Sequence, residues 1–323
     1  MASRMEPVQL KYLFELPVLS GNQTYYLDIS QIVSLCNRKF LRQGMNWVVS
    51  NVEFWTDGEA QMTVSKLPDT WMMANAWVKS FKLWQESQNQ VLDIEGRDIL
   101  GKYADFKVHY DEFHVTQGFA ANLIPFGFDI AAAGATCKWD PSTYQVPNDP
   151  TGGTTTEYRT HAIGASDFTA PDATLGMISG YAASRARPQQ NDPNVVDHLT
   201  AEDWMTALFD VGENLEEIRQ DIEDDNDSPP YLLGAPGSQL EYYPGGTIQA
   251  NTDQSFIQDV LVTRSSTSLN ADSTGSFLAP CGLLKLVTNF AAVEGAPTQI
   301  QMFLEVSPGP VKGFLAQPMQ EMN

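Results

Sequence analysis

The sequence lacks the short motifs that mark common enzyme classes. It has no G-x-x-x-x-G-K-[ST] phosphate loop, no G-x-G-x-x-G turn, no G-x-S-x-G nucleophile elbow and no H-E-x-x-H zinc pair. Its four histidines form no H-x-H pattern, which argues against a metal-dependent nicking enzyme of the His-hydrophobic-His type. Standard nucleotide and hydrolase chemistry has no visible place, so we expect no catalytic residues and a protein that is not an enzyme.

Cysteine and long apolar runs are also scarce. Cys36, Cys137 and Cys281 lie far apart with no C-x-x-C spacing, so they indicate neither a zinc site nor a disulfide framework. We interpret them as buried small apolar groups. No run of about 18 apolar residues occurs, and the N-terminus has no apolar signal-peptide core. We therefore expect neither membrane insertion nor secretion by a signal peptide.

Positive charge is scarce as well. Lys and Arg total 19 against 40 Asp and Glu, a net charge of −21. Residues 1–110 hold 11 basic and 12 acidic residues, so residues 111–323 hold 8 and 28. Such a surface repels nucleic acid in general, although a local basic patch can still bind phosphates. We interpret the acid as a solvated exterior, and a metal-rich face is the alternative.

Apolar and aromatic residues are plentiful. Hydrophobic residues make up 42% and charged residues 18% of the chain, which predicts a globular protein with a large core. The 16 Phe, 11 Tyr and 7 Trp offer more flat apolar surface than a small sandwich needs for its interior. We expect part of this surface to lie in interfaces, where aromatic residues concentrate.

Many short alternating segments separated by turn residues predict a β fold. A strand is expected at 8–16, and Asp57-Gly58 between 47–55 and 60–65 is a hairpin signal. Further strands are expected at 103–109, 113–119, 121–128, 156–163, 175–182, 240–250, 256–264, 276–288 and 299–306. We therefore predict a mainly β fold, a jelly-roll β-sandwich with long loops and one or two inserted helices, as one elaborated domain over residues 1–323. A double jelly roll is the alternative.

Three stretches have helical periodicity. The first is capped near Asp28 and is expected to run up to Gly44. The second starts after Pro68 and runs to about Asp93, with three tryptophans on one stripe, which we assign to the core or a subunit contact, and with Lys79 and Lys82 pointing away. The third covers 200–220 and leads into the acidic run 221–227.

The first helix supplies the candidate nucleic-acid-binding residues. Arg38, Lys39 and Arg42 form a basic face, and guanidinium groups bind phosphates in bidentate fashion. The competing interpretations are a solvated helix face and a salt bridge to the acidic later half of another subunit.

Two segments could attract a metal. The segment from His109 to His114 holds two imidazoles and two carboxylates, but on a strand the odd spacing points the two rings to opposite faces unless a turn intervenes. The run 221–227 offers hard oxygens but lacks the Gly and the Glu of a hand-type calcium loop. We predict no metal site and no cofactor, and leave a structural calcium ion between subunits as an alternative.

Five short segments carry a resemblance to a known family. Asn37–Met45, Ser65–Trp71, Asn75–Trp77, Tyr103–Lys107 and Leu208–Gly212 are similar to capsid proteins of small circular single-stranded-DNA viruses known mainly from environmental sampling. The resemblance is best over residues 25–130. It implies a jelly-roll coat subunit that self-assembles in many copies into an icosahedral shell, located in the virion and enclosing single-stranded DNA.

One departure from that family concerns the N-terminus. Such capsid proteins often begin with an Arg/Lys-rich arm, whereas residues 1–37 contain only Arg4 and Lys11. Direct genome condensation by this chain is therefore in doubt, and a relative with two jelly rolls, as in tailless phages whose shell lies over a membrane, stays open. Two functions from other classes remain: a carbohydrate-binding β-sandwich module, and a hydrolase that uses paired carboxylates in the acidic half.

Overall fold

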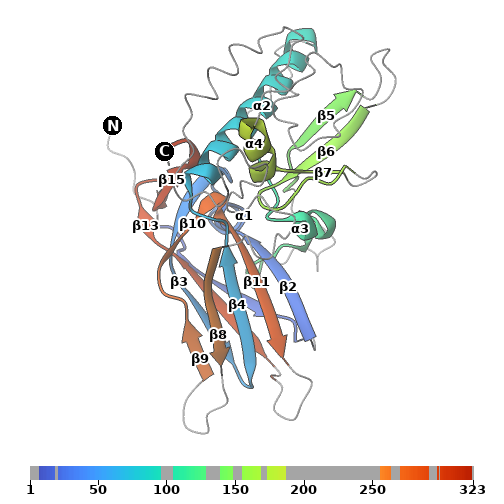
Figure 1. Cartoon of the computed structure of the whole chain (residues 1–323). Coiled ribbons are helices and arrows are strands. Elements are labelled where there is room, and N and C mark those ends of the chain that lie inside the picture. The colour runs from blue at the N-terminus through green and yellow to red at the C-terminus, as the bar shows by residue number, and fades with distance from the viewer. Residues whose placement is uncertain are drawn as a thin grey trace. The chain divides into compact units, whose positions relative to one another are not determined.

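The computed structural model describes residues 7–18, 21–95, 105–128, 139–147, 155–168, 173–186, 255–262, 270–290, 297 and 299–321 (Figure 1). The chain divides into two compact units. Unit 1 contains Met1–Asp69, Gln117–Asp140 and Ser255–Met322, and unit 2 contains Thr70–Thr116 and Pro141–Gln254. The chain thus enters unit 2 twice between two strands of unit 1. The single elaborated domain stays a prediction.

Unit 1 is built on two antiparallel sheets, which confirms the prediction of a mainly β fold with a sandwich core. Sheet A has the order β1 (Lys11–Leu16), β12 (Ile300–Val306), β3 (Met45–Thr56) and β10 (Phe277–Ala279), and β9 (Asn270–Ser273) and β15 (Ala316–Pro318) also pair with β3. Sheet B has the order β2 (Gly21–Asp28), β11 (Leu283–Phe290), β4 (Ala60–Lys66) and β8 (Ser255–Val262). A small ribbon of β13 (Pro308–Gly309) and β14 (Gly313–Phe314) follows β12.

The strand pairs of unit 1 are nested along the sequence. When β9 and β10 count as one interrupted strand and the short β15 is set aside, the described part of the sandwich has eight strands, and the first pairs with the last: β1 with β12. In the same way β2 pairs with β11, β3 with β9 and β10, and β4 with β8. The first half of the sandwich sequence is therefore matched, strand by strand, to the second half in reverse order.

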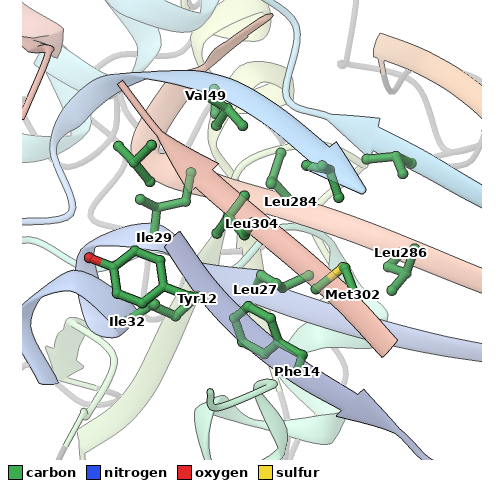
Figure 2. Packing of buried hydrophobic residues seen from close by; sticks show 14 of the residues in the cluster. Tyr12, Phe14, Leu27, Ile29, Ile32, Val49, Leu284, Leu286, Met302 and Leu304 are labelled. Carbon is green, nitrogen blue, oxygen red and sulfur yellow. The ribbon is translucent and has the colours of Figure 1, made fainter. Parts of the chain in front are cut away.

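Alternate residues of the strands fill the space between the sheets. On β1, Tyr12, Phe14 and Leu16 are buried. Buried residues of β12 and β3 continue the same inward face across the sheet. Figure 2 shows Phe14, Leu27, Met302 and Leu304 turned toward one another. Burying one such side chain contributes about 1.5–3 kcal/mol, so this period-two pattern holds the two sheets together.

A small space lies within the described core of unit 1. A space of about 10 Å³ lies between the sheets, and apolar side chains such as Leu27, Val52 and Met302 line it. That volume matches about one water molecule. No small organic ligand fits there.

Helix α1 (Ile29–Asn37) is shorter than expected. It begins as predicted, because Asp28 Oδ1 accepts hydrogen bonds from the backbone N–H groups of Ser30 (2.9 Å) and Gln31 (3.3 Å). It ends at Asn37 because Arg38 adopts a left-handed conformation with φ of 51°. The expected continuation to Gly44 is therefore wrong.

The expected hairpin of residues 47–65 is also wrong, although both of its strands exist. β3 belongs to sheet A and β4 to sheet B, so Asp57-Gly58 carries the chain from one sheet to the other. The turn residues signalled a reversal of direction. They could not signal that the partner of each strand lies more than 180 residues away.

Unit 2 combines helices and a small sheet. α2 (Trp71–Glu95) confirms the predicted second helix, and Thr70 Oγ1 accepts from the Met73 N–H at 3.3 Å. β5 (Thr143–Pro147), β6 (Thr155–His161) and β7 (Thr174–Gly176) form the sheet, and α4 (Met177–Ala186) follows β7. The strand expected at 156–163 is thus confirmed, whereas most of 175–182 is helical.

Several other expected strands are absent from the described residues. The segment 113–119 forms α3 (Glu112–Gln117), because Asp111 Oδ1 accepts from the His114 N–H at 2.9 Å and caps a helical turn. The segment 121–128 has no strand after the 3₁₀ turn Phe119–Ala121, and residues 105–109 contribute only a bridge from His109 to His161. The run 276–288 divides into β10 and β11 at the 3₁₀ turn Pro280–Gly282. Segments 200–220, 221–227 and 240–250 lie outside the described residues.

Candidate interaction surfaces

Residues 38–42 of unit 1 form a loop that is held firmly against α1. The Leu41 N–H donates to Ser34 Oγ at 3.0 Å, and Ser30 Oγ donates to the Arg42 carbonyl at 3.1 Å. Leu41 is buried in the core, whereas Arg38 and Arg42 are exposed. The loop therefore presents its guanidinium groups to solvent from a fixed backbone.

A fourth cation joins this loop from the far end of the sequence. The Lys312 ammonium donates to the Phe40 carbonyl at 2.6 Å. Arg38, Lys39, Arg42 and Lys312 together are called the basic loop cluster below. Sequence reasoning found the first three and missed Lys312, since no local pattern joins positions 272 residues apart. Among the described residues, Arg38 and Arg42 form no ion pair.

The outward side of sheet A carries apolar and acidic side chains. The register places Leu13 beside Phe303 and Phe303 beside Glu53, and places Glu15 beside Gln301 and Gln301 beside Trp55. Lys11 stands beside Glu305. The outer face of sheet A is defined by these outward residues: Lys11, Leu13, Glu15, Glu53, Trp55, Gln301, Phe303 and Glu305.

Phe303 is the centre of the outer face. The Trp55 ring meets it edge to face with centroids 6.5 Å apart, and the Lys11 ammonium lies 5.0 Å from its centroid. Lys11 also pairs with Glu53 at 3.1 Å. Beside β1, the Phe126 N–H donates to the Leu13 carbonyl at 2.7 Å, and the Phe126 side chain is 60% exposed. This face thus has three carboxylates, one ammonium and an aromatic centre that already accepts a cation.

The histidines that sequence analysis weighed as metal ligands are buried in unit 2. His109 and His114 have ring centroids 5.0 Å apart, because a helical turn intervenes between them. The Tyr110 N–H donates to His114 Nδ1 at 2.9 Å, and His161 Nε2 bonds the Ala165 carbonyl at 3.1 Å. No group of three or more His, Cys, Asp or Glu suited to a metal occurs within the described part of the chain.

Burial keeps two of these imidazoles neutral. It lowers the pKa of His109 from 6.5 to about 2, with a further decrease from His114, and it lowers the pKa of His161 to about 4 against opposing hydrogen bonds to Ala165 and Gly164. Such histidines serve as neutral hydrogen-bonding groups of the core. Within the described residues they form no open catalytic or metal-binding arrangement.

The aromatic stripe of α2 packs against Phe106. Trp77 and Phe81 stack at 5.1 Å, and Phe81 and Trp84 at 6.3 Å. Trp77 is 5% exposed, which agrees with its assignment to the core, whereas Phe81 and Trp84 are half-buried. Lys82 is exposed as expected. Lys79 does not point away: its ammonium donates to Ser184 Oγ at 2.8 Å.

Two of the three cysteines fall within the described residues, and both are free thiols. Cys281 is fully buried, as expected, whereas Cys36 is half-buried. Burial raises the pKa of the Cys36 thiol to about 11, so it stays protonated at neutral pH. Neither thiol is set up as a nucleophile.

No family model, curated protein or solved structure matches this chain. Among the described helices, none combines the length and the apolar character needed to cross a bilayer. The nested strand order and the two charged surfaces of unit 1 are therefore the observations on which a function can rest.

Proposed function

We propose that this chain is a jelly-roll capsid protein that self-assembles into an icosahedral shell around a viral genome. The nested strand order of unit 1 is the observation that carries the proposal. A ribbon of four antiparallel pairs, wound so that its strands alternate between two sheets, is the plan of the jelly roll, and viral capsid proteins, lectins and cupins share it.

The interior of the sandwich favours a structural role among these classes. A cupin-type site would need several polar ligands around a cavity inside the sandwich, whereas a cluster of apolar residues on β1, β3 and β12 fills the described core and only about 10 Å³ of space remains between Leu27, Val52 and Met302. A shell subunit needs only a rigid body with interfaces, since function then resides on the surface. The outer face of sheet A and the basic loop cluster are surfaces of that kind.

The location in the virion follows from this proposal, and single-stranded DNA as the enclosed genome stays a prediction. Contact of Arg38, Lys39 and Arg42 with DNA phosphates stays a prediction. The cluster holds four cations, which is few for neutralising a genome. Cations or another component would then supply most of the neutralisation.

The first test is assembly of the purified chain. Sedimentation velocity and negative-stain electron microscopy at several salt concentrations, with and without calcium, should reveal closed shells of uniform diameter. A chain that stays monomeric at high concentration under all of these conditions would refute the capsid proposal.

A carbohydrate-binding module is the second candidate, because jelly rolls also occur in lectins and because Phe81 and Trp84 stack at 6.3 Å with both rings half-buried. Flat partly exposed rings suit sugar faces. Binding of a small oligomer to a glycan array, lost in Trp84→Ala, would support this function in place of the capsid.

A further inference from the structure

We propose that the basic loop cluster of one copy docks on the outer face of sheet A of the next copy. This inference rests on the proposed self-assembly and names the two surfaces that carry it. Both belong to unit 1, and they are different surfaces. A contact in which each copy offers one of the two surfaces to each neighbour is heterologous, and it closes into a ring or a shell when the rotation between copies allows it.

Charge complementarity is the first argument. The basic loop cluster carries four cations, and the outer face carries Glu15, Glu53 and Glu305 against Lys11 alone. Glu53 is already paired with Lys11 at 3.1 Å. Among the described residues, Glu15 and Glu305 form no ion pair, and neither do Arg38 and Arg42. Each surface thus has two charges for which the other supplies the partner.

The aromatic centre of the face is the second argument. Phe303 lies between the Glu15 and Glu305 carboxylates. Glu305 is two residues further along β12, and Glu15 is two residues beyond Leu13, the cross-strand neighbour of Phe303 on β1. The Lys11 ammonium already lies 5.0 Å from the centroid of this half-buried ring, so the ring is placed where it can interact with a cation. A guanidinium group stacks on an aromatic ring and bonds a carboxylate with its edge, so Arg38 or Arg42 suits this combination better than a lysine does.

Rigidity is the third argument. The loop is fixed by the Leu41–Ser34 and Ser30–Arg42 hydrogen bonds, and Lys312 ties it to the C-terminal part of unit 1. The face lies on three paired strands. Docking therefore orders few backbone segments, which keeps the entropic cost of each repeated contact low.

Four charge variants of the full chain test the proposal. Arg38→Glu with Arg42→Glu makes the loop acidic, and Glu15→Arg with Glu305→Arg makes the face basic. The quadruple variant combines both exchanges and restores opposite charges at every contact. Lys82→Glu, at an exposed position of α2 in unit 2, is the control. All substituted residues are charged surface positions, and circular-dichroism melting verifies the fold of each variant.

We expect each double variant to raise the concentration needed for assembly by about tenfold or more, because like charges then face each other. The quadruple variant should recover assembly, and Lys82→Glu should assemble as the wild type does.

Double variants that assemble normally, or a folded quadruple variant that does not recover, would overturn the pairing of these two surfaces. Arg38→Glu with Arg42→Glu that assembles but loses co-purifying DNA would assign the loop to nucleic acid instead. A wild-type chain that never assembles refutes the proposed function itself, which separates the two failures.

Discussion

At the residue scale, the buried carboxylate of Asp28 joins three parts of unit 1. Its Oδ1 caps α1, while its Oδ2 accepts from Gln43 Nε2 at 3.0 Å and from Trp139 Nε1 at 2.8 Å. The side chain has no exposed surface. A buried carboxylate is tolerated because charge-assisted hydrogen bonds surround it, so each donor becomes costly to lose.

Asp28→Asn should destabilise unit 1 by about 2–4 kcal/mol. The amide that replaces the carboxylate presents an NH₂ group to at least one donor, and although Gln43 can rotate its own amide, the Trp139 indole can only donate. Urea unfolding followed by tryptophan fluorescence measures the change. Asp140→Asn, at the exposed neighbour of Trp139, is the matched control and should stay within about 0.5 kcal/mol of the wild type.

At Gly282 both the backbone conformation and the close packing of neighbouring side chains disfavour any larger residue. Its φ is +68°, and a Cβ there would lie 2.8 Å from Trp47 Cδ1 and 3.3 Å from Ile29 Cβ. Gly282→Ala should therefore lower the free energy of unfolding by about 2–4 kcal/mol. Gly275→Ala is the comparison, because its φ is +73° but nothing lies within 4 Å, so about 1 kcal/mol is expected. Equal melting temperatures for the two variants would contradict the close packing of Gly282 on Trp47.

At the element scale, some of the described strands and helices could be predicted from the sequence and others could not. Alternation predicted β1, β6, β8 and β12, and periodicity predicted α2, because these patterns repeat over one element. The partner of each strand could not be predicted. The residues of β3 and β4 are typical of a hairpin, yet both strands pair with distant segments. The segment 113–119 has strand-like residues, and a single side-chain cap from Asp111 made it helical.

The candidate surfaces follow the same rule. Arg38, Lys39 and Arg42 stand together in the sequence and could be found there. Lys312 and the outer face of sheet A could not, because Phe303 and Glu53 become neighbours only through the register of β12 on β3. Side chains on one strand are visible in a sequence, whereas a surface made by several strands depends on their order.

The histidine core of unit 2 predicts a pH dependence of stability. His161 has a pKa of about 4 in the folded chain and 6.5 when unfolded, so between these values the unfolded chain binds more protons. The contribution of His161 to the free energy of unfolding is fully present above pH 6.5 and is lost as the pH falls toward 4. From His161 alone the loss is about 3 kcal/mol.

Hydrogen exchange measures this loss locally. The Ala162 N–H, which donates to the His109 carbonyl at 2.9 Å, should exchange faster at pH 4.5 than at pH 7 after correction for intrinsic rates. His161→Gln, which cannot titrate, should weaken the dependence, and the part that comes from the lowered pKa of His109 should remain. Protection that stays constant from pH 7 to 4.5 in the wild type would contradict a neutral buried His161.

At the scale of the whole molecule, none of the four strands β1 to β4 pairs with another of the four. β1 pairs with β12, β2 with β11, β3 with β9, β10, β12 and β15, and β4 with β8 and β11. Every described partner lies at or beyond Ser255. The sandwich is thus held by contacts that span most of the chain.

A chain ending at residue 254 should therefore form no sandwich. We expect hydrogen exchange over β1 to β4 to become unprotected, and a separately produced fragment 255–323 should restore protection when it is added. The control is the full chain cleaved at the same point after folding, which should keep its protection. Persistent protection of β1 to β4 in the truncated chain would show that these strands find partners elsewhere.

The nested pairing also determines how long the early strands wait for their partners during protein synthesis. β4 ends at Lys66 and the first partner strand begins at Ser255, so a ribosome adding about 5–20 residues per second leaves the four early strands without sheet partners for roughly 10–40 s. During that time the apolar side chains of β1 and β3, Tyr12, Phe14 and Phe54 among them, have no opposite sheet to cover them. Newly made chains crowded on one messenger can pair with each other before they pair with themselves, so translation at low ribosome density favours correct folding of this protein.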